Sequence, residues 1–231
     1  MGKKHITVSL NKRELLWGWL YTAAEFLILP SVLYWITSRL FPGISDGEVN
    51  FLFYFANFLA TILIFRNFLS RNLGIAKSNL LRVGLYVILG LFVYWASGLV
   101  MADLTYRVMP DFVNINDSSI AAMSRDGFLL MAIGTVILVP TAEECIFRGL
   151  LFRGMYRKSR WAAYAISALC FCLPHVSAYI GSYEWSVLAL CFIQYLPAGL
   201  MLAWSYEKSN TILTPILIHT IINAFGIYSM R

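Results

Sequence analysis

The chain has 231 residues, of which 59% are hydrophobic and only 13% are charged, and its formal net charge is +6. Several apolar runs approach or exceed the ~20 residues that a membrane-spanning helix needs, so the composition predicts an all-α, polytopic transmembrane helix bundle. About seven spans with short loops leave no room for a separate soluble domain, and we treat residues 1–231 as a single membrane domain. No nucleic-acid motif is present, and cytoplasmic loops explain the positive charge better than a nucleic-acid surface does.

The apolar runs predict seven helical spans in chain order. The first is preceded by Lys3, Lys4 and Lys12, but it is too long for a signal peptide and no A-x-A-like cleavage site follows it, so we expect it to be retained. The longest connection is expected at residues 102–126. The seven expected spans lie near residues 15–38, 49–65, 83–101, 127–156, 161–176, 186–206 and 211–229.

Lysine and arginine residues are distributed unevenly over the loops that alternate between these spans. Thirteen fall on one side and four on the other, with Arg148 inside a span, which accounts for all 18 in the chain. Because positive residues favour the cytoplasmic side, the N-terminus is predicted to be cytoplasmic and the C-terminus to lie outside. We expect an integral protein of a bacterial plasma membrane, in contact with membrane lipids.

Three separated clusters of polar residues interrupt the apolar pattern. Charged groups at membrane depth cost roughly 2.5 to 3.5 kcal/mol even on the mildest scale, so these clusters indicate a function. Together they are typical of a hydrolytic site. The clusters are T-A-E-E-C-I-F-R with Glu143, Glu144 and Arg148, F-C-L-P-H with His175, and H-T-I-I-N with His219 and Asn223.

The spacing along the chain allows the clusters to meet. The fourth and fifth spans form an antiparallel pair that turns near Ser159, and both Glu143 and His175 are sixteen residues from that turn. At 1.5 Å per residue both lie about 24 Å from it, so a carboxylate and an imidazole can meet across the hairpin. His219 and Asn223 are four residues apart, share one helix face, and can reach the same layer.

Spacing within the first cluster separates two carboxylate roles. Glu144 and Arg148 are four residues apart in the order that favours a helical ion pair. Glu143 is rotated by about 100° from Glu144, which leaves it free to act as a general base toward water. The histidine and the asparagine of the seventh span could donate hydrogen bonds to an oxyanion, while His175 orients the water or transfers its proton.

The ordered motifs E-E-x-x-x-R, F-x-x-x-H and H-x-x-x-N resemble those of the CPBP intramembrane proteases. That family includes the type II CAAX prenyl endopeptidases, the Abi-type proteins, and bacteriocin-processing or bacteriocin-immunity proteins. The resemblance covers residues 127–229, which are expected to form the catalytic core, while residues 1–126 are expected to add further transmembrane helices. No motif residue is missing.

The resemblance implies an intramembrane endopeptidase of glutamic or metallo type, with an intramembrane site between helices 4, 5 and 7. Its substrate would be a peptide or a lipid-anchored protein of the CAAX, leader, bacteriocin or pheromone kind. Carried over by motif, Glu143 activates water with His175, the seventh-span pair His219 and Asn223 forms the oxyanion hole, and the buried Glu144–Arg148 pair braces the site.

Three questions stay open at the level of sequence. Glu143, His175 and His219 could supply three ligands to a catalytic Zn²⁺, although no H-E-x-x-H pair is present and a metal-independent mechanism is favoured. A non-catalytic immunity or regulatory protein, or a proton-coupled transporter without the usual repeat, would also retain buried polar groups. Glu25 in the first span is expected either to pair helices or to line a wet cavity. The sequence leaves the oligomeric state undetermined.

Overall fold

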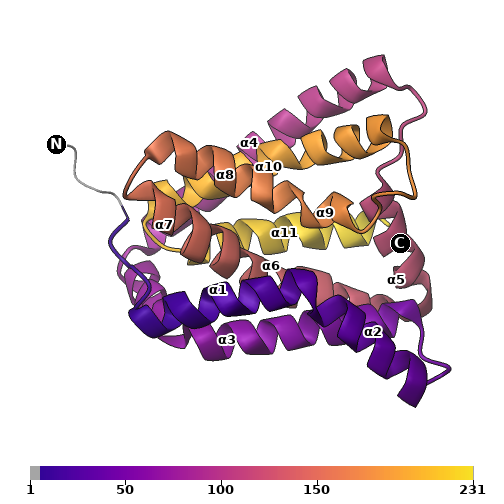
Figure 1. Ribbon diagram of the computed structural model, residues 1–231. Coiled ribbons are helices and arrows are strands. Elements are labelled where there is room, and N and C mark those ends of the chain that lie inside the picture. The colour runs from indigo at the N-terminus through magenta and orange to yellow at the C-terminus, as the bar shows by residue number, and fades with distance from the viewer. Residues whose placement is uncertain (1–5, 231) are drawn as a thin grey trace.

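Every apolar run that the sequence singled out lies on a helix in the computed structural model, which describes residues 6–230 (Figure 1). Apart from one isolated bridge between Ile180 and Tyr183, the described residues form helices, turns and loops only, so the all-α prediction is confirmed. The elements, with η marking π-helical segments, are α1 Lys12–Leu27, α2 Leu29–Leu40, α3 Asp46–Ser78, α4 Leu80–Val108, α5 Ile115–Ile133, η1 Gly134–Leu138, α6 Val139–Glu144, η2 Cys145–Phe152, α7 Arg153–Tyr156, α8 Arg160–Cys172, α9 Pro174–Ser177, α10 Trp185–Ser209 and α11 Leu213–Ser229.

Fewer helices meet the length of a full membrane span than the seven that the sequence indicated. Within residues 6–230, four stretches are long and apolar enough, and α1 with α2, bent by 55° at their junction, makes up to five. The expected fifth and seventh spans correspond to α8, of 13 residues, and α11, of 17 residues. The four long stretches are Asp46–Ser78, Leu80–Val108, Ile115–Tyr156 and Trp185–Ser209.

The long outer loop expected at residues 102–126 is not present. Helix α4 continues to Val108 and α5 begins at Ile115, so the connection is only residues 109–114. Charged residues extend α4 instead of ending it, because Asp103 and Arg107 lie one turn apart and form an ion pair with an N–O distance of 2.8 Å. In this chain, charged residues past an apolar run mark the end of the apolar span and not the end of the helix.

The helices form two groups with a third set between them (Figure 1). On one side α1 packs along α3, and on the other α10 packs against α8 and α4. Helix α11 contacts α4, α10 and η1, while α5 packs on α3. The broken helix from α5 to α7 and the helix α11 therefore occupy the interior, where the polar clusters lie.

A buried glutamate fixes the first helix against the third. The side chain of Asn11 caps α1 by accepting a hydrogen bond from the backbone N–H of Glu14. The side chain of Glu14 in turn accepts a hydrogen bond from the backbone N–H of Asn11. The same carboxylate, 2% exposed, accepts from the backbone N–H of Phe68 at 2.6 Å and from Arg71 at 3.1 Å. This acid is fully paired, so its burial serves the fold.

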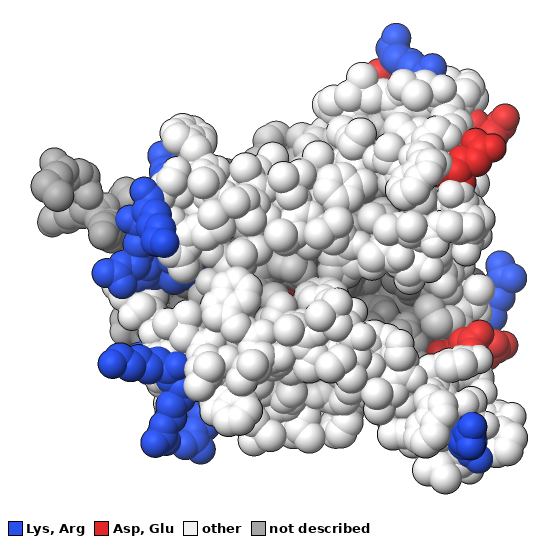
Figure 2. Space-filling view, viewed as in Figure 1, with Lys and Arg blue, Asp and Glu red and all other residues white. Residues whose placement is uncertain are grey.

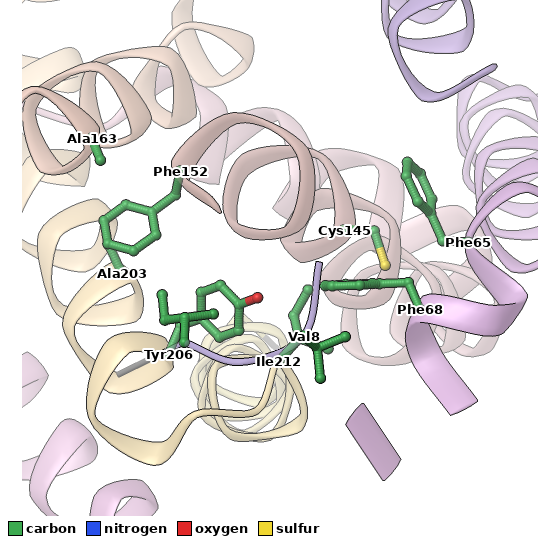
Figure 3. Packing of buried hydrophobic residues seen from close by; sticks show 10 residues of the cluster. Val8, Phe65, Phe68, Cys145, Phe152, Ala163, Ala203, Tyr206 and Ile212 are labelled. Atoms are coloured by element: carbon green, nitrogen blue, oxygen red, sulfur yellow. The ribbon is translucent and has the colours of Figure 1, made fainter. Parts of the chain in front are cut away.

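One end of the bundle is a dry core, drawn in Figure 3. Phe152 and Tyr206 face one another there, with ring centroids 6.2 Å apart, and join η2 to α10. Segment 6–10 lies over this core and brings in Ile6 and Val8, both at least 90% buried. The cluster comprises Ile6, Val8, Phe65, Phe68, Cys145, Phe152, Ala163, Ala203, Tyr206 and Ile212.

We expect Gly199→Ala to lower the stability of the bundle by about 1–3 kcal/mol, because the crossing of α8 and α10 has no room for a methyl group. A Cβ atom at Gly199 would lie 3.0 Å from the Cα of Ala168, which is backbone and cannot rotate away. Gly84→Ala in α4 is the control, since its Cβ would meet nothing within 4 Å. Unfolding midpoints in detergent that drop equally for both variants would contradict this reading.

Candidate active site

The two adjacent glutamates lie where the central helix is irregular. Glu143 and Glu144 end the six-residue α6, which is flanked by the π-helical segments η1 and η2. Pro140 near the start of α6 lacks a backbone N–H for the helical hydrogen bond, and the π-helical segment η1 ends directly before α6. Pro174 likewise starts α9 after the break that ends α8. Such π segments are frequent at functional sites because they change the direction of neighbouring side chains.

Glu144 and Arg148 form the ion pair that their spacing predicted. The Nη1 of Arg148 lies 3.1 Å from the Oε1 of Glu144, and both side chains are 0% exposed. The Nη2 donates to the carbonyl oxygen of Gly199 on α10 at 3.0 Å, and the guanidinium carbon lies 4.5 Å from the ring centroid of Phe171. The pair therefore connects the central helix to α10 and to α8.

His219 joins both carboxylates, a contact that the sequence did not indicate. Its Nδ1 lies 3.0 Å from the Oε1 of Glu144, and its Nε2 lies 3.9 Å from the Oε2 of Glu143. The imidazole is 5% exposed and packs edge-on against Phe171. The Arg148–Glu144–His219 chain thus fixes the orientation of the imidazole that faces Glu143.

His175 on α9 is oriented by the last turn of the preceding helix, α8. Its Nδ1 lies 3.0 Å from the carbonyl oxygen of Phe171, and because a carbonyl only accepts, this bond places the ring hydrogen on Nδ1 and leaves Nε2 available. The ring stacks on Tyr195 of α10 with centroids 4.0 Å apart. The Tyr195 hydroxyl in turn donates to Asp117 at 2.9 Å, so α5, α9 and α10 meet at this histidine.

Asn223 lies on the same side of α11 as His219, as their spacing predicted. Its amide nitrogen donates to the carbonyl oxygen of Thr135 in η1 at 2.8 Å. One amide hydrogen is therefore used to join α11 to η1, and the second remains available for another acceptor. The contact with Thr135 is a further feature that the sequence did not indicate.

Four of the predicted site residues line one large cavity of about 1260 Å³, and the surface is hollowed between the two groups of helices on the face seen in Figure 2. Glu144 and Arg148 lie behind the cavity wall, where they support His219 and do not line the cavity themselves. The four lining residues are Glu143, His175, His219 and Asn223.

Additional groups complete the cavity from segments outside the three motifs. Glu25 of α1, which the sequence allowed as a lining residue, does line it, as does Gln194. Tyr195 and Phe171 supply rings, and the Gly199 carbonyl supplies an acceptor behind the wall. Backbone carbonyls and aromatic rings are abundant in an apolar chain, so the sequence gives no signal that selects these particular ones.

The zinc ligand set considered for this site is not assembled. Among residues 6–230, no group of three His, Cys, Asp or Glu side chains lies close enough together to hold a metal ion. Within the considered set, the Nε2 of His219 lies 3.9 Å from the Oε2 of Glu143, and the Nδ1 of His175 is directed at the Phe171 carbonyl. The residues present do not fit a three-ligand metal centre in this arrangement.

Comparison with known proteins finds a similarity that covers this site. Residues 125–225 match the model described as type II CAAX prenyl endopeptidase Rce1-like, and this range includes every predicted site residue. The resemblance to the CPBP family is confirmed. A UPF0177 protein, YxdF of Lactococcus lactis subsp. lactis (strain IL1403), is 25% identical over 144 residues, covering 58% of this chain and 75% of that protein. No solved structure matches the chain significantly.

The Rce1-like region begins in α5 and ends in α11, so the matched range leaves out α1 to α4. The long apolar helices and the matched region together indicate an integral membrane protein, and residues 125–225 are similar to the CAAX-type proteases. The cavity nevertheless takes part of its wall from outside the matched range, through Glu25, Tyr54, Asn57 and Tyr94. Helices α1, α3 and α4 therefore contribute to the same cavity as the matched region.

Proposed function

We propose that this protein is an active intramembrane endopeptidase, which hydrolyses a peptide bond near a membrane-associated end of its substrate. The proposal depends on the surroundings of the Glu143 carboxylate. Its Oε2 atom has no hydrogen-bond partner in the structure, although it is buried in the wall of a large cavity beside His219 and on the same cavity as His175. An unpaired carboxylate oxygen in such a place is costly unless a ligand or water uses it.

In the proposed reaction Glu143 is the general base. It takes a proton from a water molecule as the water oxygen attacks the carbonyl carbon of the scissile peptide. The C–N bond then breaks, and the proton held by Glu143 passes to the leaving amine nitrogen. His175 assists from its free Nε2, which accepts a hydrogen bond from the attacking water and so orients it.

His219 and Asn223 are proposed to stabilise the oxyanion. When both ring nitrogens of His219 are protonated, Nδ1–H donates to Glu144 and Nε2–H is free to donate into the cavity. Asn223 contributes its second amide hydrogen, the first being held by Thr135. Preorganised donors of this kind account for about 2.7–4 kcal/mol of transition-state stabilisation each. Glu144 and Arg148 act as positioning residues through His219.

We also propose that the protein lies in a bacterial plasma membrane with its N-terminus in the cytoplasm. On the face shown in Figure 2, the largest group of Lys and Arg lies at the end where α1 begins, whereas the other end carries most of the visible Asp and Glu together with a few separate Lys or Arg side chains. Positive residues are enriched on the cytoplasmic side of membrane proteins. This charge asymmetry supports the orientation that the loops predicted.

The function is tested by comparing membrane-associated peptides from cells that carry the native chain, cells that carry the Glu143→Gln chain, and cells without either. We expect cleaved termini that appear only with the native chain, because the amide of glutamine cannot accept the proton of water. The two chains must be present in the membrane at equal levels. Identical peptides from all three cell lines would contradict a peptidase, and termini shared by the native and variant chains would remove Glu143 from the reaction.

A further inference from the structure

Acidic side chains predominate in the lining of the cavity, where among residues 6–230 only the histidines His175 and His219 can carry positive charge. Four carboxylates line it, and no Lys or Arg of residues 6–230 does. The chain as a whole has an excess of positive residues, so this selection is not a consequence of composition. The four acids are Glu25, Asp46, Asp117 and Glu143.

The acids lie both at the surface and in the interior. Asp46 and Asp117 are exposed, in the first turns of α3 and α5. Glu25 and Glu143 are inside the bundle, and Glu25 is only 7% exposed. A cleft lined mainly by one sign of charge between low-dielectric walls concentrates ions of the opposite sign. Because acids lie both at the rim and inside, this cavity is expected to attract cations along its whole depth.

Glu25 is the acid whose burial the proposed reaction leaves unexplained. It lies two residues before the end of α1, close to the 55° bend between α1 and α2. Among residues 6–230 its Oε2 has no hydrogen-bond partner, and its carboxylate is near enough to that of Glu143 for the two to interact electrostatically. Glu14, on the same helix, is also buried but is fully paired. A second acid beside the proposed base therefore faces the space that substrate would occupy.

The polar neighbours of Glu25 cannot neutralise it. Tyr21, one turn earlier on α1, is close enough to interact with Glu25 and donates its hydroxyl hydrogen to Asn57 at 2.9 Å. Asn57 is itself 4% exposed and lines the cavity. These groups orient the carboxylate but carry no positive charge, so the free oxygen is suited to a cation that arrives with the substrate.

Building on the proposed peptidase function, we propose that the cavity selects substrates with a Lys or Arg side chain close to the cleaved bond, and that Glu25 binds this cationic group. Among residues 6–230, a peptide whose free terminal carboxylate had to enter would meet four acidic side chains and no Lys or Arg to pair with. The occupant favoured by the lining is therefore a basic segment, such as a membrane-associated peptide with a cationic residue at the bilayer boundary.

The test uses the full-length protein in liposomes and transmembrane peptides that differ at one residue near the cleaved bond, carrying arginine or its uncharged isostere citrulline. We expect kcat/KM for the arginine peptide to be higher by roughly tenfold or more, which corresponds to about 1.4 kcal/mol. In the Glu25→Gln variant, the ratio of kcat/KM for the arginine peptide to kcat/KM for the citrulline peptide should fall close to one. In the Glu25→Asp variant, this ratio should remain above one.

Glu184→Gln is the matched control, because it makes the same chemical change at an exposed acid that does not line the cavity. It should keep the native ratio. Equal cleavage of both peptides by the native protein would overturn the charge preference. A ratio that stays native in Glu25→Gln would overturn the role of Glu25.

A binding measurement separates this inference from the peptidase proposal. Photo-crosslinking of the same two peptides to His175→Ala, which keeps all four cavity acids, should favour the arginine peptide to a similar degree. If the native protein cleaves neither peptide but the arginine peptide still crosslinks preferentially, the peptidase proposal fails and the cationic preference stands. If crosslinking is equal for both peptides, the cationic preference fails whatever the turnover shows.

Discussion

Replacing Glu143 with glutamine should lower kcat/KM of the purified protein by about a thousandfold, within the 10²–10⁴ that general base catalysis contributes. Glutamine has the same size as glutamate but cannot accept the proton of the attacking water. The fold should be unaffected, because the Oε2 of Glu143 makes no hydrogen bond in the structure. Initial rates in liposomes and the unfolding midpoint in detergent measure the two effects separately.

The control for this variant is again Glu184→Gln, which should keep native turnover. A Glu143→Gln protein that retains turnover within tenfold of native would show that another group activates the water. A variant whose unfolding midpoint falls along with its turnover would instead indicate that Glu143 supports the structure. The combination expected here, lost turnover at an unchanged midpoint, is the one that a catalytic base alone produces.

The parts of the site that follow from local spacing could be predicted from the sequence. Glu144 and Arg148 are one turn apart, so their ion pair depends only on the helix continuing between them. The same reasoning places His219 and Asn223 on one side of α11, and both do line the cavity. The irregular π turns of η2 did not disturb the first pair, because residues four apart stay close in either kind of helix.

Contacts between distant helices could not be predicted in this way. The bond between His219 and Glu144 depends on the rotation and depth of α11 relative to α6, which spacing along one helix leaves undefined. The pairing of Asn223 with the Thr135 carbonyl depends in the same way on how α11 lies against η1. Each is set by how apolar faces pack across the bundle, and those faces have many equivalent leucine, isoleucine and phenylalanine residues.

The number and length of the membrane spans could be predicted only in part from the sequence. Hydropathy located all seven helical regions, but it does not distinguish a helix that crosses the membrane from one that is shorter, such as α8. It also placed a long loop at residues 102–126, where polar residues in fact continue α4 and begin α5. Helix ends depend on caps such as Asn114, whose side chain accepts from the backbone N–H groups of Asn116 and Asp117, and these are weak signals.

Replacing Arg148 with methionine should destabilise the bundle by about 3–5 kcal/mol, which is the usual cost of removing one partner of a buried ion pair and leaving the other charge unpaired. Methionine keeps much of the apolar volume, so the loss comes from the two hydrogen bonds to Glu144 and to the Gly199 carbonyl. Glu144 would then keep its hydrogen bond to His219, while its Oε2 already has no hydrogen-bond partner among residues 6–230. Denaturant unfolding in mixed micelles measures the change in the free energy of unfolding.

The double variant Glu144→Gln with Arg148→Met distinguishes an ion pair from ordinary packing. Removing both charges leaves no uncompensated carboxylate or guanidinium, so the double variant should be less destabilised than the sum of the two single variants, by about 0.5–3 kcal/mol. It should not return to native stability, because the bond from Arg148 to Gly199 on α10 is still missing. Strict additivity would show that the two side chains act independently. Turnover should fall in all three variants, since Glu144 and Arg148 hold the imidazole of His219 in place and that imidazole faces the proposed base.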